Sequence, residues 1–406
     1  MDSLTQIALG AAVGELLLGR KIGNKAMFWG AVGGTIPDLD VLANPFLSEA
    51  ASVKFHRGPT HSIFFAAVFS VLMAWIMEKY YSSYLFHSKN WRKFWRIIFT
   101  AIPILLLVLI LGIGWSGISF FSGAIALVIL GLLAFSVWQR TPVQPQDIEK
   151  PSFLNWYWFF FWVFVSHILL DIFTTYGTQM LWPFTDYPFQ LDTISIVDPL
   201  YTIPLVVFGF VASLYHRSSD RRKFFNRLAL ILSTFYLLLT VANKVHMDSV
   251  FRESLEDKGL EYLQIKTTPT LFNNLLWFGI AELEDEYIIG YYSLLDSERE
   301  FSDWHREEKN HDLIRNFKHD RDVEILVWFS RGFYKVQKSE EGYQFTDLRF
   351  GNIDFTGTNQ DAGGPFFFLL KKDSESGEIN ISRNRPEIEG DFGKIWRTFW
   401  QRVGGR

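Results

Sequence analysis

Cysteine is absent from this chain of 406 residues. Disulfide frameworks, thiolate metal sites, iron–sulfur clusters and cysteine nucleophiles are therefore excluded. Charged residues are scarce, at 20%, and the net charge of −4 argues against a dedicated nucleic-acid-binding protein, which normally carries a basic excess. The chain also lacks a G-x-S-x-G sequence, which argues against a serine hydrolase of the common α/β type.

Hydrophobic residues are abundant, at 49% of the chain, but they are unevenly distributed. Residues 1–244 contain 18 Lys and Arg and 13 Asp and Glu, separated by long apolar runs. Residues 245–406 contain 21 and 30, and have no run long enough to cross a bilayer. We therefore predict two domains: a helical membrane domain over residues 1–244 and a soluble domain over residues 245–406.

The membrane half contains eight apolar segments. A bilayer core about 30 Å thick requires about 20 apolar residues in a helix. The segments are residues 7–18, 26–42, 62–77, 97–115, 118–138, 156–173, 199–215 and 228–243. The first two are rich in Gly and Ala, which favours close packing between helices. The fold class that we predict is an α-helical polytopic membrane bundle of about eight helices, followed by a soluble α+β domain.

Positive charges predict the orientation of this bundle. The loops at 19–25, 79–96, 139–155 and 216–227 together carry fifteen Lys and Arg. The opposite side, apart from the C-terminal domain, has only Lys54 and Arg57. Because Lys and Arg concentrate in cytoplasmic loops, we predict a multi-pass protein of the bacterial inner membrane, with its N-terminus and residues 245–406 extracytoplasmic.

The soluble half has the pattern of mixed structure. Alternating or aromatic-rich runs predict the strands of one antiparallel sheet. These runs are 262–268, 275–284, 287–295, 323–336, 342–350 and 365–371. The charged stretch 296–318 favours a helix instead.

Polar clusters at the ends of the apolar segments are the candidate functional groups, because polar side chains near lipid are costly. One cluster contains Asp38 and Asp40, a second contains His56 and His61, and a third contains His167 and Asp171. Given the charges of the loops, all of them fall on the same side of the membrane. The four-residue spacing of His167 and Asp171 places both on one face of a helix. The Gly58-Pro59 turn can bring His56 and His61 to one centre.

These residue types indicate a site for a divalent metal. The six proposed ligands are Asp38, Asp40, His56, His61, His167 and Asp171. Imidazoles and carboxylates without a thiol suit Zn²⁺ best, or Mn²⁺ or Fe²⁺, and six ligands suggest two ions. Asp40 could instead act as a general base, and Arg57 could contact an anionic phosphate group.

Structural roles are the alternative for each cluster. His61 could mark the start of a helix, Asp38 could form a turn after Pro37, and His167 with Asp171 could be a hydrogen-bonded pair. Asp2 and Gln6 are more typical of a helix cap than of metal ligands.

The order of these motifs resembles the YdjM-like family of bacterial membrane-bound, metal-dependent hydrolases. The resemblance rests on Pro37-Asp38-Leu39-Asp40, on the heptad from His56 to Ser62, and on His167 with Asp171 and Thr174, and it covers roughly residues 1–215. The opening six residues are also similar, although many members have histidine in place of Gln6. The resemblance implies metal-dependent hydrolysis without naming a substrate.

The sequence thus predicts a membrane-embedded metal-dependent hydrolase. A site at the height of the headgroups suggests a phospholipid or lipid-linked phosphoester as the substrate, with the lipid bilayer as the only partner that the sequence indicates. The alternative is a non-catalytic membrane carrier or sensor that binds a metal ion. A carrier should place polar residues at mid-helix along a path, whereas here they gather at one end.

Overall fold

A computed structural model describes residues 1–406 except 92, 96, 98–148, 352–365, 373–378 and 385–391. The chain divides into two compact units. The first contains residues 1–70 and 159–406, and the second contains residues 71–158. The candidate functional residues all belong to the first unit.

Two N-terminal helices of the first unit pack closely through glycine. Helix α1 spans Ser3–Ile22 and α2 spans Asn24–Thr35. A side chain at Gly30 of α2 would collide with the carbonyl oxygen of Gly10 of α1. The close approach that the Gly-rich sequence predicts is therefore confirmed. Asp2 caps α1 by accepting a hydrogen bond from the Thr5 amide, as predicted for this residue.

Three described helices are long and apolar enough to cross a membrane. They are α4 (Ile63–Ser82), α8 (Phe153–Ile172) and α10 (Asp220–Asp257). Helix α9 (Pro199–Ser213) is apolar but shorter. The predicted segments 97–115 and 118–138 lie outside the described residues. Eight membrane-spanning helices are therefore not supported.

Segment 26–42 shows one reason why eight membrane-spanning helices are not supported. The α-helix in this segment ends at Thr35, and a 3₁₀ helix, η1 (Pro37–Phe46), follows it. Pro37 cannot donate the backbone hydrogen bond that would continue the α-helix. Helix α2 has 12 residues and is therefore about 18 Å long, which is too short for a bilayer core of about 30 Å.

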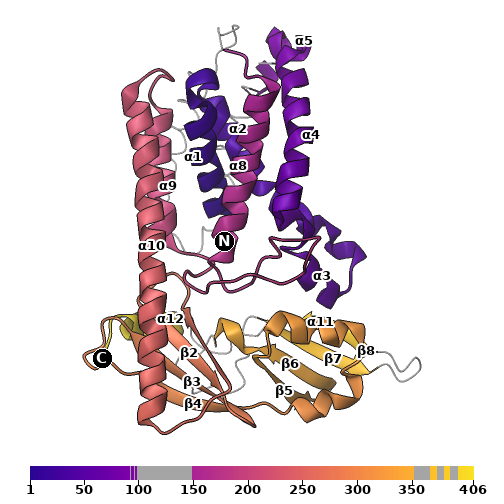
Figure 1. The fold of residues 1–406 in the computed structure, drawn as a ribbon, viewed down its shortest axis with the longest axis vertical. Coiled ribbons are helices and arrows are strands. Elements are labelled where there is room, and N and C mark those ends of the chain that lie inside the picture. The colour runs from indigo at the N-terminus through magenta and orange to yellow at the C-terminus, as the bar shows by residue number, and fades with distance from the viewer. Residues whose placement is uncertain (92, 96, 98–148, 352–365, 373–378, 385–391) are drawn as a thin grey trace. The chain divides into compact units, whose positions relative to one another are not determined.

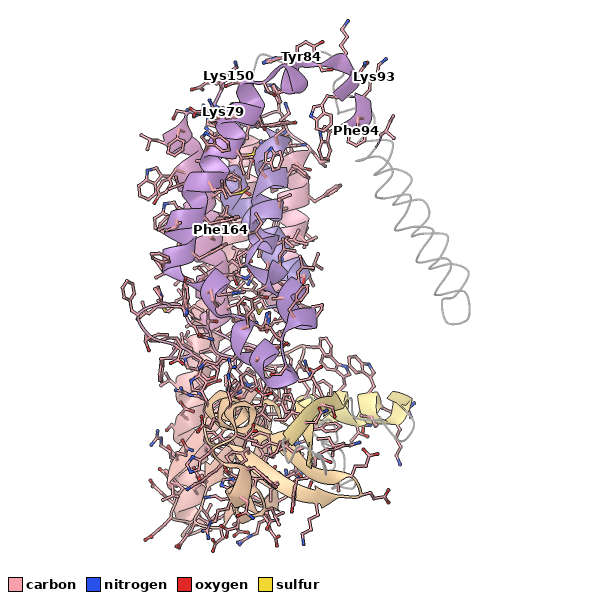
Figure 2. All side chains as sticks on the ribbon, turned by 90° about the vertical axis from the view of Figure 1, so that its right-hand side faces the viewer. Lys79, Tyr84, Lys93, Phe94, Lys150 and Phe164 are labelled. Atoms are coloured by element: carbon pink, nitrogen blue, oxygen red, sulfur yellow. The ribbon has the colours of Figure 1, made fainter. Side chains whose placement is uncertain are left out.

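The second unit contains the end of α4, the short helix α5 (Tyr84–His87) and the start of α8. Tyr81 packs against Trp156, with ring centroids 5.1 Å apart. Figure 2 shows Lys79, Lys93 and Lys150 gathered at one end of this unit. The sequence assigns these three lysines to one side of the membrane; which side is cytoplasmic stays a prediction.

Short elements connect the longer helices of the first unit around the candidate site. After η1 come α3 (Glu49–Phe55) and a 3₁₀ turn, η2 (Pro59–His61). Ser48 caps α3 through the amide of Ala51. The connection from α8 to α9 is an irregular loop over residues 173–198, with a bridge between Thr178 and Phe189.

The C-terminal region contains two antiparallel sheets of four strands, where the sequence predicted one. In each sheet the strands follow in chain order, as Figure 1 shows. The first consists of β1 (Gln264–Pro269), β2 (Leu276–Glu282), β3 (Glu286–Ser293) and β4 (Ser302–Glu308). The second consists of β5 (Tyr334–Ser339), β6 (Gly342–Asp347), β7 (Phe367–Lys372) and β8 (Ile379–Asn384).

One predicted strand of this region is partly a helix. Segment 323–336 was expected to be a strand, but its first part belongs to helix α11 (Arg321–Ser330). Asp320 caps this helix, and Val323, Leu326 and Phe329 recur at the helical spacing on its buried face. The remaining helices are η3 (His311–Phe317), η4 (Leu348–Phe350) and α12 (Phe392–Val403).

The charged stretch 296–318 was expected to be helical, but it forms β4 and η3. Strand β4 lies at the edge of its sheet, so one side of it stays open to solvent and tolerates charges. Arg306 of this strand binds Glu286 of the neighbouring β3 across the pair. Pairing between strands therefore outweighs the local helix propensity.

Helix α10 connects the helices to the C-terminal sheets. Its 38 residues run through position 244, where the sequence places the domain boundary. Its last turns bury Phe251 and Leu255 against Trp277 of the first sheet. Figure 1 shows this helix continuing from beside α9 to beside β2, β3 and β4. The division into a membrane domain and a soluble domain stays a prediction.

Candidate metal centre

The end of α8 supplies two side chains of the site. His167 and Asp171 lie in its last turns, four residues apart, and both are buried. Their spacing places His167 Nε2 3.5 Å from Asp171 Oδ2. The helix ends at Ile172, so this pair stands where the chain leaves the helix.

The 3₁₀ helix η1 directs the side chains of Asp38 and Asp40 to different partners. A 3₁₀ helix has about three residues per turn, so residues two apart point in different directions. Asp38 faces His61 and His167, whereas Asp40 faces His56 and the backbone of Arg57. The sequence motif brings two carboxylates to the site, and the backbone directs them to different partners.

The turn before α4 places His61. The Arg57 backbone is in the left-handed region, with φ of 59°, and its amide donates to Asp40 Oδ2 over 3.0 Å. The His61 amide donates to the carbonyl of Gly58, and the 3₁₀ turn ends at His61. His61 is completely buried, while 27% of the His56 side chain is exposed.

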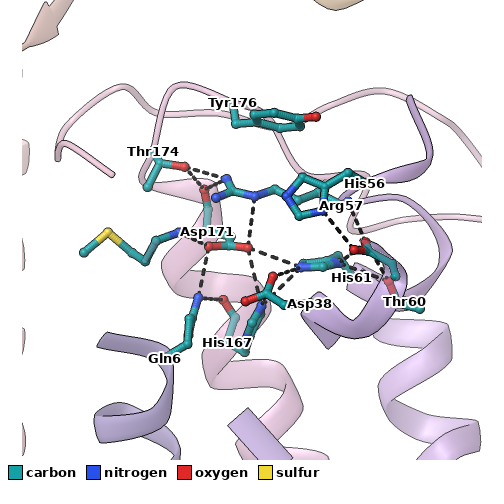
Figure 3. A network of polar contacts seen from close by, with 12 residues as sticks. Gln6, Asp38, His56, Arg57, Thr60, His61, His167, Asp171, Thr174 and Tyr176 are labelled. Carbon is teal, nitrogen blue, oxygen red and sulfur yellow. Dashed lines mark hydrogen bonds and ion pairs between the residues drawn. The ribbon is translucent and has the colours of Figure 1, made fainter. Parts of the chain in front are cut away.

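Four of the six predicted ligands converge. Asp38, His61, His167 and Asp171 each offer one donor atom, and these four atoms lie within 4.8 Å of one another. His61 Nε2 is 3.1 Å from His167 Nε2, 3.3 Å from Asp38 Oδ1 and 3.4 Å from Asp171 Oδ2. Figure 3 shows these side chains pointing toward one another from three separate elements. The predicted clusters therefore meet on one side of the helices.

Hydrogen bonds determine which imidazole nitrogens face the centre. His167 Nδ1 is 2.7 Å from the carbonyl oxygen of Gly34, which can only accept, so Nδ1 carries the hydrogen. His61 Nδ1 is 3.4 Å from Asp40 Oδ2 and 3.1 Å from the hydroxyl of Thr60, which itself donates to Asp40. Both Nε2 atoms therefore face into the group, and each can bind a metal ion when it carries no proton. Ligating histidines are commonly oriented in this way.

Asp40 and His56 lie next to this group of four residues and do not belong to it. Asp40 Oδ1 is 2.9 Å from His56 Nδ1, and its Oδ2 contacts His61, Thr60 and the Arg57 amide. The described residues thus contain one group of four donors in place of the six-ligand, two-ion arrangement that the sequence suggests. Whether any of these residues binds metal stays a prediction.

Arg57 and Gln6 surround Asp171. The Arg57 guanidinium is buried, with Nε 3.3 Å from Asp171 Oδ2 and Nη1 donating to the Thr174 hydroxyl over 2.7 Å. Gln6 Nε2 donates to Asp171 Oδ1 over 3.0 Å, and the amino group of Met1 contacts the same oxygen. Gln6 was assigned to a helix cap; its contact with Asp171 was missed because 165 residues separate the pair.

Tyr176 was not singled out from the sequence. Its ring lies 5.0 Å from the Arg57 guanidinium and packs edge-on against His56. Its other neighbours are Phe329 and Phe366 of the C-terminal region. An aromatic residue in a loop carries no local signal for such a role, since only the tertiary contacts reveal it.

Electrostatics keep the two carboxylates of η1 ionised. Burial opposes the ionisation of Asp38, but the contacts with His167 and His61 outweigh it and hold the pKa of Asp38 well below its usual value. Burial likewise opposes ionisation of Asp40, and His56 and His61 lower the pKa of Asp40 below its usual value. Ionised carboxylates are the form that binds cations.

The donor set fits a divalent cation. Two nitrogens and two carboxylate oxygens are a donor set typical of zinc and of manganese or iron(II). Among the described residues, none donates a hydrogen bond to the buried Asp171 Oδ2. Two imidazole lone pairs and two carboxylates that face one another also repel unless a proton or a metal ion lies between them. The arrangement can therefore hold a metal ion.

Comparison with known proteins identifies one family. A family profile described as YdjM inner membrane protein matches residues 1–247. This match covers the four converging residues and ends within α10. No curated protein and no solved structure matches the chain.

Proposed function

The chain belongs to the YdjM inner membrane protein family, and we propose that it is a membrane-embedded hydrolase that depends on a divalent metal ion. We place its activity at the extracytoplasmic membrane surface, on a phosphoester of a lipid or lipid-linked substrate. The observation that supports this proposal is the convergence of Asp38, His61, His167 and Asp171 within 4.8 Å at the ends of apolar helices.

The proposed metal ligands are these four residues, and Zn²⁺ is the metal that suits them best. When bound, a divalent ion supplies Lewis-acid chemistry, which polarises a phosphoryl oxygen and makes water more acidic. Three of the four ligands are buried, and Asp38 is the one with an exposed edge, at 22% of its side chain. Substrate would therefore approach from the side of Asp38.

The surroundings of Asp38 support a lipid substrate. The same 3₁₀ helix exposes large apolar side chains, with Leu42 at 68% and Phe46 at 86%. Leu39 and Val41 are also exposed. Exposed apolar side chains of this kind favour contact with acyl chains. An amphiphilic substrate could then present its polar group to Asp38 while its chains remain in the bilayer.

Asp40 and Arg57 would act through their neighbours. Both oxygens of Asp40 already interact with His56, His61, Thr60 or the backbone of Arg57, so a positioning role suits Asp40 better than that of general base. The partly exposed His56, oriented by Asp40, is then the side chain that would take up a proton at the open edge. Arg57 would hold Asp171 in place, because its guanidinium is buried beside that carboxylate.

Metal analysis combined with lipid turnover tests the proposal. Protein purified in detergent and in nanodiscs would be analysed for Zn, Mn and Fe, and release of phosphorylated headgroups from phospholipids would be followed. His61→Ala and Asp171→Ala should lose both metal and turnover. His319→Ala, which removes an exposed histidine, serves as the matched control. Equal metal content in all variants would show that the assignment of ligands is wrong.

A metal sensor or carrier is the second candidate. Four protein donors, three of them buried, also resemble a closed structural site, whereas catalytic zinc usually has three protein ligands and an open position. Metal binding that depends on His61 and Asp171, without turnover of any phosphoester or ester, would favour this second function.

A further inference from the structure

Helix α12 has two different faces. Phe399 and Val403 are buried in the core formed with the first sheet, and Arg402 is paired with Asp296 and Asp303. Trp396 and Trp400 lie beside this buried face, and each is 41% exposed. Lys394 and Arg397 are exposed beside them. The helix is thus anchored to the sheet by Phe399 and Val403, and it leaves indole rings and positive charges exposed beside that contact.

This composition is typical of a helix that lies in a membrane interface. Tryptophan is enriched at the level of the headgroups, because its ring is apolar while its N–H group can bond to polar neighbours. Lys and Arg on the same helix are attracted to anionic lipids. A soluble surface gains nothing from exposing two indole rings one turn apart.

The contacts of α12 place it near the edge of the apolar band. Trp396 packs against Phe272, with ring centroids 5.7 Å apart. The Phe272 amide donates to the carbonyl of Val197, just before α9 begins. Asn274 accepts a hydrogen bond from the Asn243 side chain of α10 over 2.8 Å. The loop 271–274 is therefore hydrogen-bonded both to the backbone just before α9 and to Asn243 of α10.

The exposed side chains of α10 show where the bilayer boundary lies along this helix. From Ile231 to Val245, two residues after Asn243, its exposed large side chains are all apolar. From Arg252 to Asp257 its exposed side chains are charged. The bilayer boundary on α10 thus lies close to Asn243. Leu271, in the same loop as Phe272, is also exposed and adds apolar surface at this height.

We propose that α12, together with Leu271, rests in the headgroup layer of the leaflet on the side of the metal centre. Trp396 and Trp400 would enter the interface, and Lys394 and Arg397 would bind anionic headgroups. The partner is a lipid surface, and the contact would hold the C-terminal sheets against the membrane. The inference is independent of the proposed hydrolysis, because it involves none of the metal ligands.

Spin labelling of the full chain tests this proposal without background, since the protein has no cysteine. A nitroxide would be attached at Arg397→Cys, between the two tryptophans. The control label is at Glu256→Cys, an exposed position on α10 that lies about 16 Å beyond Val245 along the helix. Accessibility to oxygen and to a polar nickel complex would be measured in nanodiscs of phosphatidylcholine and phosphatidylglycerol.

We expect the ratio of oxygen to nickel accessibility at position 397 to be several-fold higher than at position 256. Replacing both Trp396 and Trp400 by alanine should reduce this ratio toward the value at position 256. Equal ratios at the two positions in the chain with both tryptophans would overturn the proposal. Spin–spin broadening at position 397 would also overturn it, because it would show that a second copy of the chain covers this face.

Discussion

At the scale of the residue, the geometry of two imidazoles sets the character of the site. His61 Nε2 and His167 Nε2 face each other at 3.1 Å, with their Nδ1 atoms directed to other acceptors. Such a pair can bind a cation, and the adjacent carboxylates of Asp38 and Asp171 provide negative charge for one. Residues that hydrogen-bond to the proposed ligands should therefore influence metal affinity as well.

Asp40 offers a direct test of that influence. Asp40→Asn removes the charge that orients the Nδ1–H of His61, and we expect metal affinity to fall by about 10- to 100-fold. Competition with a chelating dye would measure the change. Asp186→Asn is the matched control, because Asp186 is an exposed carboxylate that pairs with Lys54 and with none of the proposed ligands. Unchanged affinity in Asp40→Asn would contradict the role of Asp40.

Residue types and spacing were enough to predict the four converging side chains. The i, i+4 spacing of His167 and Asp171 determines their common face on any helix. The different roles of Asp38 and Asp40 could not be predicted, because they depend on the 3₁₀ conformation after Pro37. The contact of Gln6 with Asp171 likewise depends on how α1 packs beside α8.

At the scale of the element, the contact of α1 with α2 positions part of the site. Gly10 and Gly30 let the two backbones approach, and Gly34, one turn after Gly30, offers its carbonyl to His167 Nδ1. The glycines therefore affect both packing and the orientation of a proposed ligand. Small residues have this function in many membrane helix pairs.

Gly30→Ala tests the importance of this contact. A Cβ at Gly30 would collide with the Gly10 carbonyl oxygen, which is backbone and cannot move aside alone. We expect a loss of about 1–3 kcal/mol in stability, seen as a lower Tm of the protein in detergent. Gly209→Ala in α9 is the control, since a Cβ there meets nothing within 4 Å, and its Tm should stay equal or rise. Equal Tm values for the two variants would argue against close packing at Gly30.

The sequence predicted helices better than strands that carry charge. Long apolar runs identify α4, α8 and α10 because such runs have few other stable arrangements. The stretch 296–318 misled the prediction, since its charges suit either an exposed helix or an edge strand. Pairing with β3 decided between them.

At the scale of the whole molecule, Arg349 connects the second sheet to the loop beside the site. Arg349 and Asp347 are both completely buried, with Nη2 2.7 Å from Asp347 Oδ2. Nη1 also donates to Gln190 Oε1 and to the carbonyl of Thr175. Thr175 lies between Thr174 and Tyr176, which both contact Arg57. The C-terminal region is thus tied to the backbone that surrounds the proposed metal centre.

Arg349→Met should show how strong this connection is. The change leaves Asp347 buried without its partner, and we expect a loss of about 3–5 kcal/mol in stability. Adding Asp347→Leu should restore much of it, because no charge then remains buried. Arg299→Met, which breaks an exposed pair with Glu253, is the control and should have little effect. Thermal unfolding in detergent would measure all three; a similar Tm for Arg349→Met and the control would contradict the expectation.

The sequence by itself determined what depends on local chemistry: the three long apolar helices, the family, and the residue types that can bind a divalent cation. Apolar length and ligand type leave few alternatives, so they can be interpreted without coordinates. Only the tertiary structure decided which carboxylate faces the histidines, how the C-terminal strands divide between two sheets, and which face of α12 is exposed. Those outcomes depend on contacts between residues far apart in the chain, and such contacts leave no local pattern.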